Sequence, residues 1–168
     1  MDARIIKIGF GGGCHWCTEA VFQALHGVIK VEQGWIASFD AHSAFSEAVI
    51  VHYKEDDISL TTLIEVHLHT HKSSSKHSMR KKYRSAVYTF SGSQEEQAKS
   101  IISSFQPEFD HKLITEVHPF KLFRPSPEAI QNYYKKNPSK PFCTKYIDPK
   151  LSVIADQFQD QLKRIRHV

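Results

Sequence analysis

The stretch GFGGGCHWC (Gly9–Cys17) joins a glycine-rich turn to two closely spaced cysteines. The residues before it, Arg4–Phe10, are rich in isoleucine and predict a short strand, whereas Thr18–Leu25 has apolar residues at the spacing of one helical face. This order places Cys14 at or near the first turn of a helix. Unpaired backbone N–H groups and the partial positive charge at a helix N-terminus stabilise a thiolate.

The second cysteine, Cys17, lies on the same face of this predicted helix as Cys14, so a disulfide between them is sterically feasible. A glycine turn that only carries two buried cysteines stays open as an alternative. The chain has three cysteines, too few for a disulfide scaffold. In a reducing compartment a close pair is more often catalytic or metal-binding than structural.

Zinc is one use for such a pair, but the third cysteine, Cys143, lies far along the chain. The histidines that could complete a site alternate with other residues, which does not fit the usual closed zinc spacing: His67, His69, His71 and His77. We therefore expect neither a metal nor another cofactor.

A thioredoxin-like redox site is a stronger rival. That fold needs a cis-proline opposite the C-x-x-C motif, within a few tens of residues. The first proline of this chain is Pro107, which counts against the thioredoxin fold. Thiol–disulfide exchange by Cys14 and Cys17 on another scaffold remains an alternative function.

The rest of the chain alternates between strand and helix patterns. The segments with β-branched and aromatic residues predict strands, and the segments with apolar residues at helical spacing predict helices. We expect an α+β fold in a single domain over residues 1–168, with a mixed, mainly antiparallel sheet, packed helices and a ferredoxin-like core. The predicted strands are 28–39, 44–53, 83–90 and 113–120, the helices are 59–69, 93–105, 127–136 and 151–164, and the loops include 72–82 and an extended segment at 137–150.

Composition and charge exclude several classes of protein. The 168 residues are 40% hydrophobic and 24% charged, as in ordinary globular domains. A net charge of +4 is too small to indicate a nucleic-acid partner. No apolar run approaches the roughly 18 residues of a transmembrane helix, and the first ten residues lack the features of a signal peptide. We expect a cytoplasmic protein that binds neither nucleic acid nor membrane.

The segment GCHWCTE (Gly13–Glu19) resembles G-C-F-W-x-x-E, the signature of the A class of peptide methionine sulfoxide reductases. Further segments are similar to that family's motifs in the same order: HGVIKVEQGW (26–35), FSEAVIVHY (45–53), KYRSAVY (82–88), ITEVHP (114–119) and KNPSKPFC (136–143). The resemblance thus spans roughly residues 5–148. It implies reduction of the S epimer of methionine sulfoxide, free or protein-bound.

The resemblance also assigns roles to residues. Cys14 is the nucleophile by its position and becomes a sulfenic acid, and Glu47 stands at the position of the acid that protonates the sulfoxide oxygen. Cys143 occupies the position of the family's resolving cysteine, while Cys17 is the nearer thiol. Thioredoxin or a similar dithiol would then reduce the disulfide. We expect a monomer.

Four side chains are expected to bind the substrate: His15, Trp16, Trp35 and Tyr83. Plain core packing is the alternative for each aromatic residue. Several positions depart from the family pattern and leave the substrate preference open: His15 replaces a phenylalanine, Cys17 a glycine, Trp35 a tyrosine and Ser78 an aspartate, and a tyrosine and a histidine are lost at Ala129 and Ile130.

Overall fold

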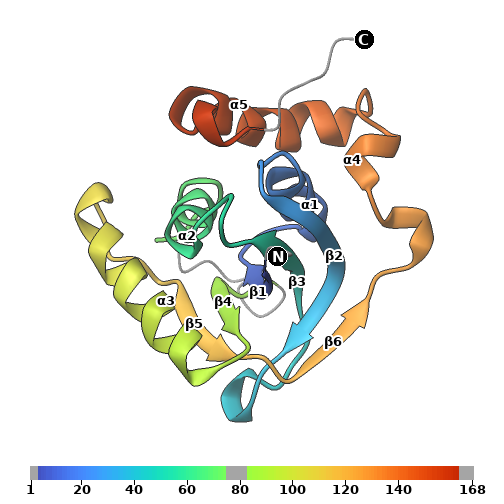
Figure 1. Ribbon diagram of the computed structural model, residues 1–168. Helices are drawn as coiled ribbons and strands as arrows, with labels where there is room; N and C mark the ends of the chain where they lie inside the picture. Colours follow the sequence, from blue (N-terminus) through green and yellow to red (C-terminus); the bar gives the residue numbers. More distant parts are fainter. Residues whose placement is uncertain (1–3, 75–82, 163–168) are drawn as a thin grey trace.

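The computed structural model describes residues 4–74 and 83–162, which form one six-stranded sheet with helices (Figure 1). The strands are β1 (Ile5–Gly11), β2 (Val28–Ala37), β3 (Ser46–Lys54), β4 (Ala86–Thr89), β5 (Glu116–Pro119) and β6 (Leu122–Pro125). The α-helices are α1 (His15–Gln23), α2 (Leu60–His69), α3 (Gly92–Phe105), α4 (Tyr133–Lys136) and α5 (Asp148–Gln157).

The order of the strands across the sheet is β5-β4-β1-β3-β2-β6. Strands β4 and β5 run parallel, and the other neighbouring pairs are antiparallel. This arrangement confirms the predicted α+β class with a mixed, mainly antiparallel sheet. Within residues 4–74 and 83–162, every helix is too short or too polar to span a membrane.

The main core lies between the sheet and the helices α1, α2, α3 and α5. Alternate residues of a strand point to the same face, so Phe10 of β1 and Val51 of β3 both point toward these helices. Phe10 stacks on Phe22 of α1, with ring centroids 4.6 Å apart. Both rings are fully buried, and burial of a side chain of this size contributes about 1.5–3 kcal/mol.

The opposite face of the sheet carries a smaller apolar cluster. It includes Ile36, Ala48, Ile50, Ala86 and Tyr88. The hairpin between β2 and β3 contains a 3₁₀ turn, η1 (Asp40–His42), and lies at one end of the sheet (Figure 1). The two faces of the sheet thus carry two separate sets of side chains.

The glycine turn after β1 is set by close packing. Gly12 has φ +152°, and a Cβ there would lie 2.5 Å from Cδ2 of His71. A Cβ at Gly11 would lie 2.9 Å from the carbonyl oxygen of Arg84. The carbonyl of Gly11 also accepts a hydrogen bond from Nε2 of His67, at 2.8 Å. Glycine therefore lets neighbouring segments approach the turn that leads into α1.

The C-terminal third departs from the sequence-based expectation. The predicted helix 127–136 is divided, because Asn132 adopts a left-handed conformation (φ 56°) between the 3₁₀ turn η4 (Glu128–Ile130) and α4. Strand β6 was not predicted. It is stabilised by pairing with Gly34–Ala37 of β2. A strand of four residues is too short to show a clear hydrophobic pattern in the sequence.

The predicted extended segment 137–150 is also wrong. A π-helical turn, η5 (Cys143–Ile147), runs directly into α5, which begins at Asp148 rather than at the predicted Leu151. Burial of Cys143 and Ile147 against α1 favours the helical turn, a tertiary effect that local composition does not reveal. The predicted helix 151–164 ends early, because α5 stops at Gln157 and a separate 3₁₀ turn, η6 (Gln159–Gln161), follows. Residues 163–164 and most of the predicted loop 72–82 lie outside the described residues.

Helix α3 begins at Gly92, one residue before the predicted start at Ser93. Ser91 is the N-cap, and its hydroxyl accepts the backbone N–H of Gln94 at 3.1 Å. The side chain of Gln94 in turn accepts the backbone N–H of Phe90 at 2.8 Å. A reciprocal cap of this kind is therefore present, but it begins at the earlier serine.

Candidate active site

Cys14 is the N-cap residue of α1, as the sequence predicted. Its carbonyl oxygen accepts the backbone N–H groups of Cys17 (3.1 Å) and Thr18 (3.2 Å), which form the first turn. The Cys14 side chain is partly exposed. Its thiol is thus accessible at the positive end of the helix dipole.

The thiols of Cys14 and Cys17 share a hydrogen bond. Donation from Cys17 lowers the pKa of the Cys14 thiol, with further help from the backbone N–H groups of Trp16 and Cys17, although burial and Glu47 oppose the shift. The same hydrogen bond, reinforced by burial, raises the pKa of Cys17. Cys14 is therefore the more acidic thiol of the pair, and Cys17 is the hydrogen-bond donor.

The third cysteine, Cys143, lies in the same cluster. Its side chain is fully buried with Cys17, Ala20 and Ile147, and the partly buried Cys14 packs against this group. Burial raises the pKa of the Cys143 thiol. All three cysteines are free. The fold thus brings Cys143 to the Cys14–Cys17 pair from far along the chain. Cys143 is held in a buried helical turn rather than a surface loop.

Lys150 is a charged neighbour of this cluster that sequence reasoning missed. Its ammonium group donates a hydrogen bond to the carbonyl of Thr70. Burial lowers the pKa of Lys150, while the thiols of Cys17 and Cys14 oppose this effect. The Lys150 charge in turn favours ionisation of Cys17. Its spacing in the sequence could have indicated this position, because a residue seven positions after Cys143 lies on the same side of a helix.

Glu47 and His15 form a buried polar pair beside the nucleophile. Glu47 is 6% exposed, and its Oε1 accepts the backbone N–H of His15 at 3.2 Å. The His15 ring donates from Nδ1 to the carbonyl of Gly34 at 2.7 Å, so its Nε2 faces Oε1 of Glu47 at 3.5 Å. The imidazole and the carboxyl group are therefore close neighbours in the buried part of the site.

Of the two other predicted aromatic residues, Trp35 lies beside this pair and Tyr83 lies in the segment before β4. Trp35 faces Glu47 across strands β2 and β3, and its ring meets the edge of the His15 ring at 5.1 Å. Tyr83 is half-buried in the segment before β4. The next residue, Arg84, donates its backbone N–H to the hydroxyl of Ser46 at 2.7 Å, one position before Glu47. The predicted position Ser78 lies outside the described residues.

Trp16 belongs to an aromatic cluster that the sequence did not predict. Its ring stacks on Tyr133 with centroids 4.1 Å apart and meets the edge of Phe142 at 5.2 Å. Its Nε1 is buried without a hydrogen-bond partner in the described part of the chain. One face of the indole is therefore covered by Tyr133, and its N–H group is buried.

A buried carboxyl group holds this cluster in place. Glu19, 1% exposed, accepts the backbone N–H groups of Asn132 (3.0 Å) and Tyr133 (3.1 Å). It also accepts a hydrogen bond from the side chain of Gln33, at 3.0 Å. The glutamate of the GCHWCTE motif therefore positions Tyr133 against Trp16, which explains its spacing from the cysteine.

Groups of side chains that could hold a metal ion lie elsewhere. Two such groups occur in residues 4–74 and 83–162, and neither contains a cysteine: His42, Glu116 and His118, and Glu65, His69 and Glu108. Of the histidines considered for a cysteine-based zinc site, His67 and His71 are hydrogen-bonded around the glycine turn. His77 lies outside the described residues.

Known proteins resemble this chain over most of its length. The sequence model of one family, described as peptide methionine sulfoxide reductase, matches residues 6–162. The peptide methionine sulfoxide reductase MsrA of Acinetobacter baumannii (strain AYE) is 32% identical over 92% of this chain and 96% of that protein. The MsrA of Deinococcus radiodurans is 32% identical over 92% of this chain and 82% of that protein.

Solved structures show the same fold. The reduced form of Mxr1 from Saccharomyces cerevisiae has a TM-score of 0.74 at 21% identity and covers 85% of this chain and 91% of that chain. Methionine sulfoxide reductase A of Corynebacterium diphtheriae has a TM-score of 0.71 at 21% identity, with coverages of 81% and 76%. Mxr1 in complex with Trx2 has a TM-score of 0.60 at 20% identity, with coverages of 79% and 89%.

The site has a cysteine of lowered pKa at a helix N-terminus, with further thiols and a buried acid beside it. These features define the class as a thiol-dependent oxidoreductase. Within that class, the chain belongs to the peptide methionine sulfoxide reductase family. It is a peptide-methionine (S)-S-oxide reductase, and the predicted family and activity are confirmed. The alternative of a protein devoted to thiol–disulfide exchange is not favoured.

Proposed function

We propose that Cys14 is the nucleophile, that Glu47 delivers the proton to the sulfoxide oxygen, and that Cys17 and Cys143 resolve the oxidised cysteine. The observation that carries this proposal is the position of the Cys14 thiolate, next to the Cys17 thiol and the Glu47–His15 pair. Nucleophile, acid and second thiol are then within one site.

The first step transfers oxygen from substrate to enzyme. The Cys14 thiolate attacks the sulfoxide sulfur and forms a transient sulfur–sulfur bond, while Glu47 donates a proton to the sulfoxide oxygen. The protonated oxygen then moves to the Cys14 sulfur, the sulfur–oxygen bond of the substrate and the transient sulfur–sulfur bond break, and methionine leaves. The oxygen remains on Cys14 as a sulfenic acid. The substrate is thereby reduced by two electrons and Cys14 is oxidised by two.

The proton for this step comes from the Glu47–His15 pair. Because Nδ1 of His15 donates to Gly34, Nε2 is the ring atom that exchanges a proton with Glu47. Replacement of the family's phenylalanine by His15 therefore places an imidazole next to the Glu47 carboxyl group. It also makes the pocket for the substrate methyl group less apolar. Trp16, Trp35 and Tyr83 supply its aromatic walls.

The second step forms a disulfide. A thiol displaces the hydroxyl group of the Cys14 sulfenic acid, a sulfur–sulfur bond forms, and water leaves. Cys17 is the first resolving thiol, because it is already hydrogen-bonded to Cys14. The Lys150 charge partly offsets the raised pKa of the Cys17 thiol. Cys143 then attacks Cys17 and releases the Cys14 thiolate.

The final disulfide, between Cys17 and Cys143, is reduced by thioredoxin or a similar dithiol. The complex of the related Mxr1 with Trx2 supports this choice of reductant. Cys143 is fully buried, so the segment around η5 has to open before a reductant can reach it. We further propose that residues 1–168 act as one domain, as a monomer and in the cytoplasm, on protein-bound or free methionine sulfoxide.

The order of resolution is tested with Cys143→Ser protein and one equivalent of methionine S-sulfoxide. We expect two thiols to be lost, with Cys14 linked to Cys17 in the mass spectrum. The matched Cys17→Ser variant should accumulate sulfenic acid. If Cys143→Ser stalls as a sulfenic acid while Cys17→Ser forms a Cys14–Cys143 bond, the proposed order is wrong.

A further inference from the structure

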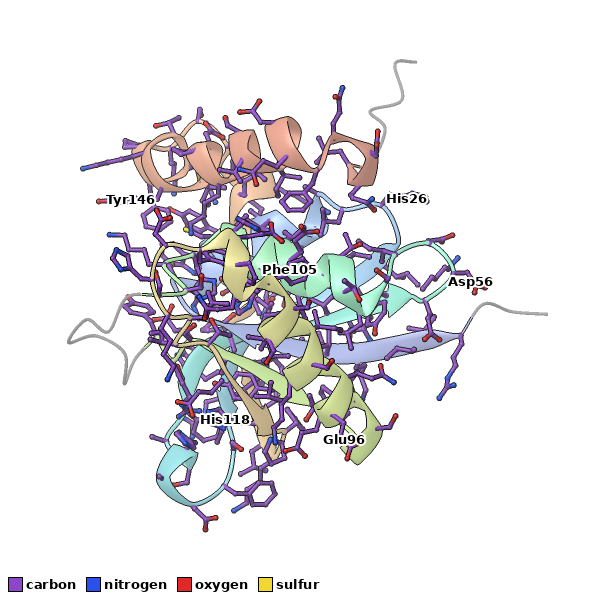
Figure 2. All side chains as sticks on the ribbon, turned by 90° about the vertical axis from the view of Figure 1, so that its left-hand side faces the viewer. His26, Asp56, Glu96, Phe105, His118 and Tyr146 are labelled. Atoms are coloured by element: carbon purple, nitrogen blue, oxygen red, sulfur yellow. The ribbon has the colours of Figure 1, made fainter. Side chains whose placement is uncertain are left out.

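A cluster of histidine and glutamate side chains lies on the sheet face opposite the active site. Glu116 and His118 are alternate residues of β5 and therefore point to one side of the sheet. They pair with Ala86 and Tyr88 of β4, which belong to the apolar cluster of that face. Figure 2 labels His118 on this side of the molecule. His42 joins the group from η1, in the hairpin between β2 and β3.

The three side chains already lie close enough to share an ion. One ligand atom from each lies within 4.8 Å of the others. The rings of His42 and His118 have centroids 3.9 Å apart. Because η1 and β5 are far apart in the sequence, this convergence is produced by the fold and not by local spacing.

His118 is the buried member of the group. It is 8% exposed, and its Nε2 has no hydrogen-bond partner in the described part of the chain. Buried polar atoms are normally paired, so an orphaned imidazole nitrogen in such a cluster points to a missing ligand.

We propose that His42, Glu116 and His118 form a binding site for a divalent transition-metal ion, with Zn²⁺ as the best match. Two imidazoles and one carboxylate are the donor set that suits zinc, whereas magnesium and calcium prefer oxygen ligands. Glu116 is exposed, so the ion can enter from solvent and keep a water molecule as its fourth ligand.

Metal binding at this site has a mechanical consequence. It joins the hairpin to β5, the strand at one edge of the sheet. The hairpin connects β2 and β3, which carry Trp35 and Glu47. The ion would therefore stabilise the end of the sheet that supports the catalytic acid, without touching the reacting atoms.

The second group, Glu65, His69 and Glu108, is a weaker candidate and provides the control. His69 is already hydrogen-bonded to Glu108 at 3.2 Å and stacked on Phe109 at 4.6 Å. It offers one imidazole and two carboxylates, and none of the three side chains is buried.

Calorimetric titration of reduced protein with Zn²⁺ tests the proposal. Wild-type protein, His69→Ala and the exposed-surface control His26→Ala should all bind the same number of equivalents. His42→Ala and Glu116→Gln should each lower the affinity for one equivalent of Zn²⁺ by about 100-fold or more. Even changes to residues that only support metal ligands lower metal affinity by about 10–100-fold. Zinc at about 100 times its Kd should raise the Tm of wild-type protein by roughly 5–10 °C. The same zinc concentration should raise the Tm of His42→Ala by less.

Two further readouts separate this site from the cysteines and from misfolding. Co²⁺ bound at the proposed site should give visible absorption bands in wild-type protein, without a thiolate charge-transfer band. These bands should be absent from His42→Ala. Circular dichroism and metal-free sulfoxide reduction of His42→Ala and Glu116→Gln should match wild-type protein. The proposal is overturned if these variants keep every equivalent, if His69→Ala loses the same one, or if all bound Co²⁺ shows thiolate ligation.

Discussion

At the scale of single residues, the proposed chemistry depends on the hydrogen bond between the Cys14 and Cys17 thiols, which lowers the pKa of one and raises the pKa of the other. Cys14 is both the N-cap of α1 and the acceptor of the Cys17 hydrogen bond, and both features favour its thiolate. Cys17 is correspondingly held as a thiol. The glycine that the family has at this position offers no such donor, so the C-x-x-C pair tunes the nucleophile in this chain.

We expect Cys17→Ala to raise the pKa of Cys14, because it removes the hydrogen bond that lowers it most. The rate of Cys14 alkylation by iodoacetamide should then rise with pH along a curve displaced to higher pH. The matched variant Cys143→Ala leaves this hydrogen bond in place and should keep the original midpoint. Coincident curves for Cys17→Ala and wild-type protein would rule out this role for Cys17.

The role of Glu47 gives a second prediction. Glu47→Gln keeps the shape of the side chain but removes its acidic proton, so turnover should fall by about 10²–10⁴-fold. The surface variant Glu95→Gln, on α3, should turn over at the wild-type rate. If Glu47→Gln is as fast as wild type, the acid is another group, with His15 the next candidate.

The sequence could predict the residues whose chemistry is local. Cys14, Cys17 and Glu47 stand in recognisable motifs, and the fold brings them to one site. Lys150, Tyr133 and Phe142 could not be predicted, because only the packing of the C-terminal segment on α1 brings them there. The role of Tyr83 stays a prediction.

At the scale of elements, one buried carboxyl group links α1 to α4. Glu19 accepts two backbone N–H groups from the start of α4 and so fixes Tyr133 on Trp16. The strands and helices with strong periodicity were predicted near their observed bounds. The divided helix at Asn132, strand β6 and η5 were not, since tertiary contacts rather than local pattern determine them.

Glu19→Gln should weaken this link. The amide group has only one accepting oxygen, so at least one buried N–H of α4 loses its partner, at about 1–3 kcal/mol for each such group. We expect urea unfolding to show a free energy of unfolding lower by about 2 kcal/mol, with altered Trp16 fluorescence. The exposed Glu128→Gln change on η4 should affect neither quantity. An unchanged unfolding curve for Glu19→Gln would contradict the anchoring role.

At the scale of the whole molecule, the sheet separates two sets of polar groups. One face, beneath the helices, leads to the thiols and Glu47, and the other carries the His42–Glu116–His118 cluster (Figures 1 and 2). The predicted α+β class followed from the order of strands and helices. The metal cluster could not be foreseen, because its members come from separate segments and share no motif.

The central claim is that Cys14 reduces the S epimer of methionine sulfoxide. Its most direct test is turnover of the separated S and R epimers with dithiothreitol, by wild-type protein and by Cys14→Ser. We expect wild-type protein to convert the S epimer to methionine and leave the R epimer intact, and Cys14→Ser to convert neither while keeping the wild-type circular dichroism spectrum. Substantial turnover by Cys14→Ser, or preference for the R epimer, would contradict the account.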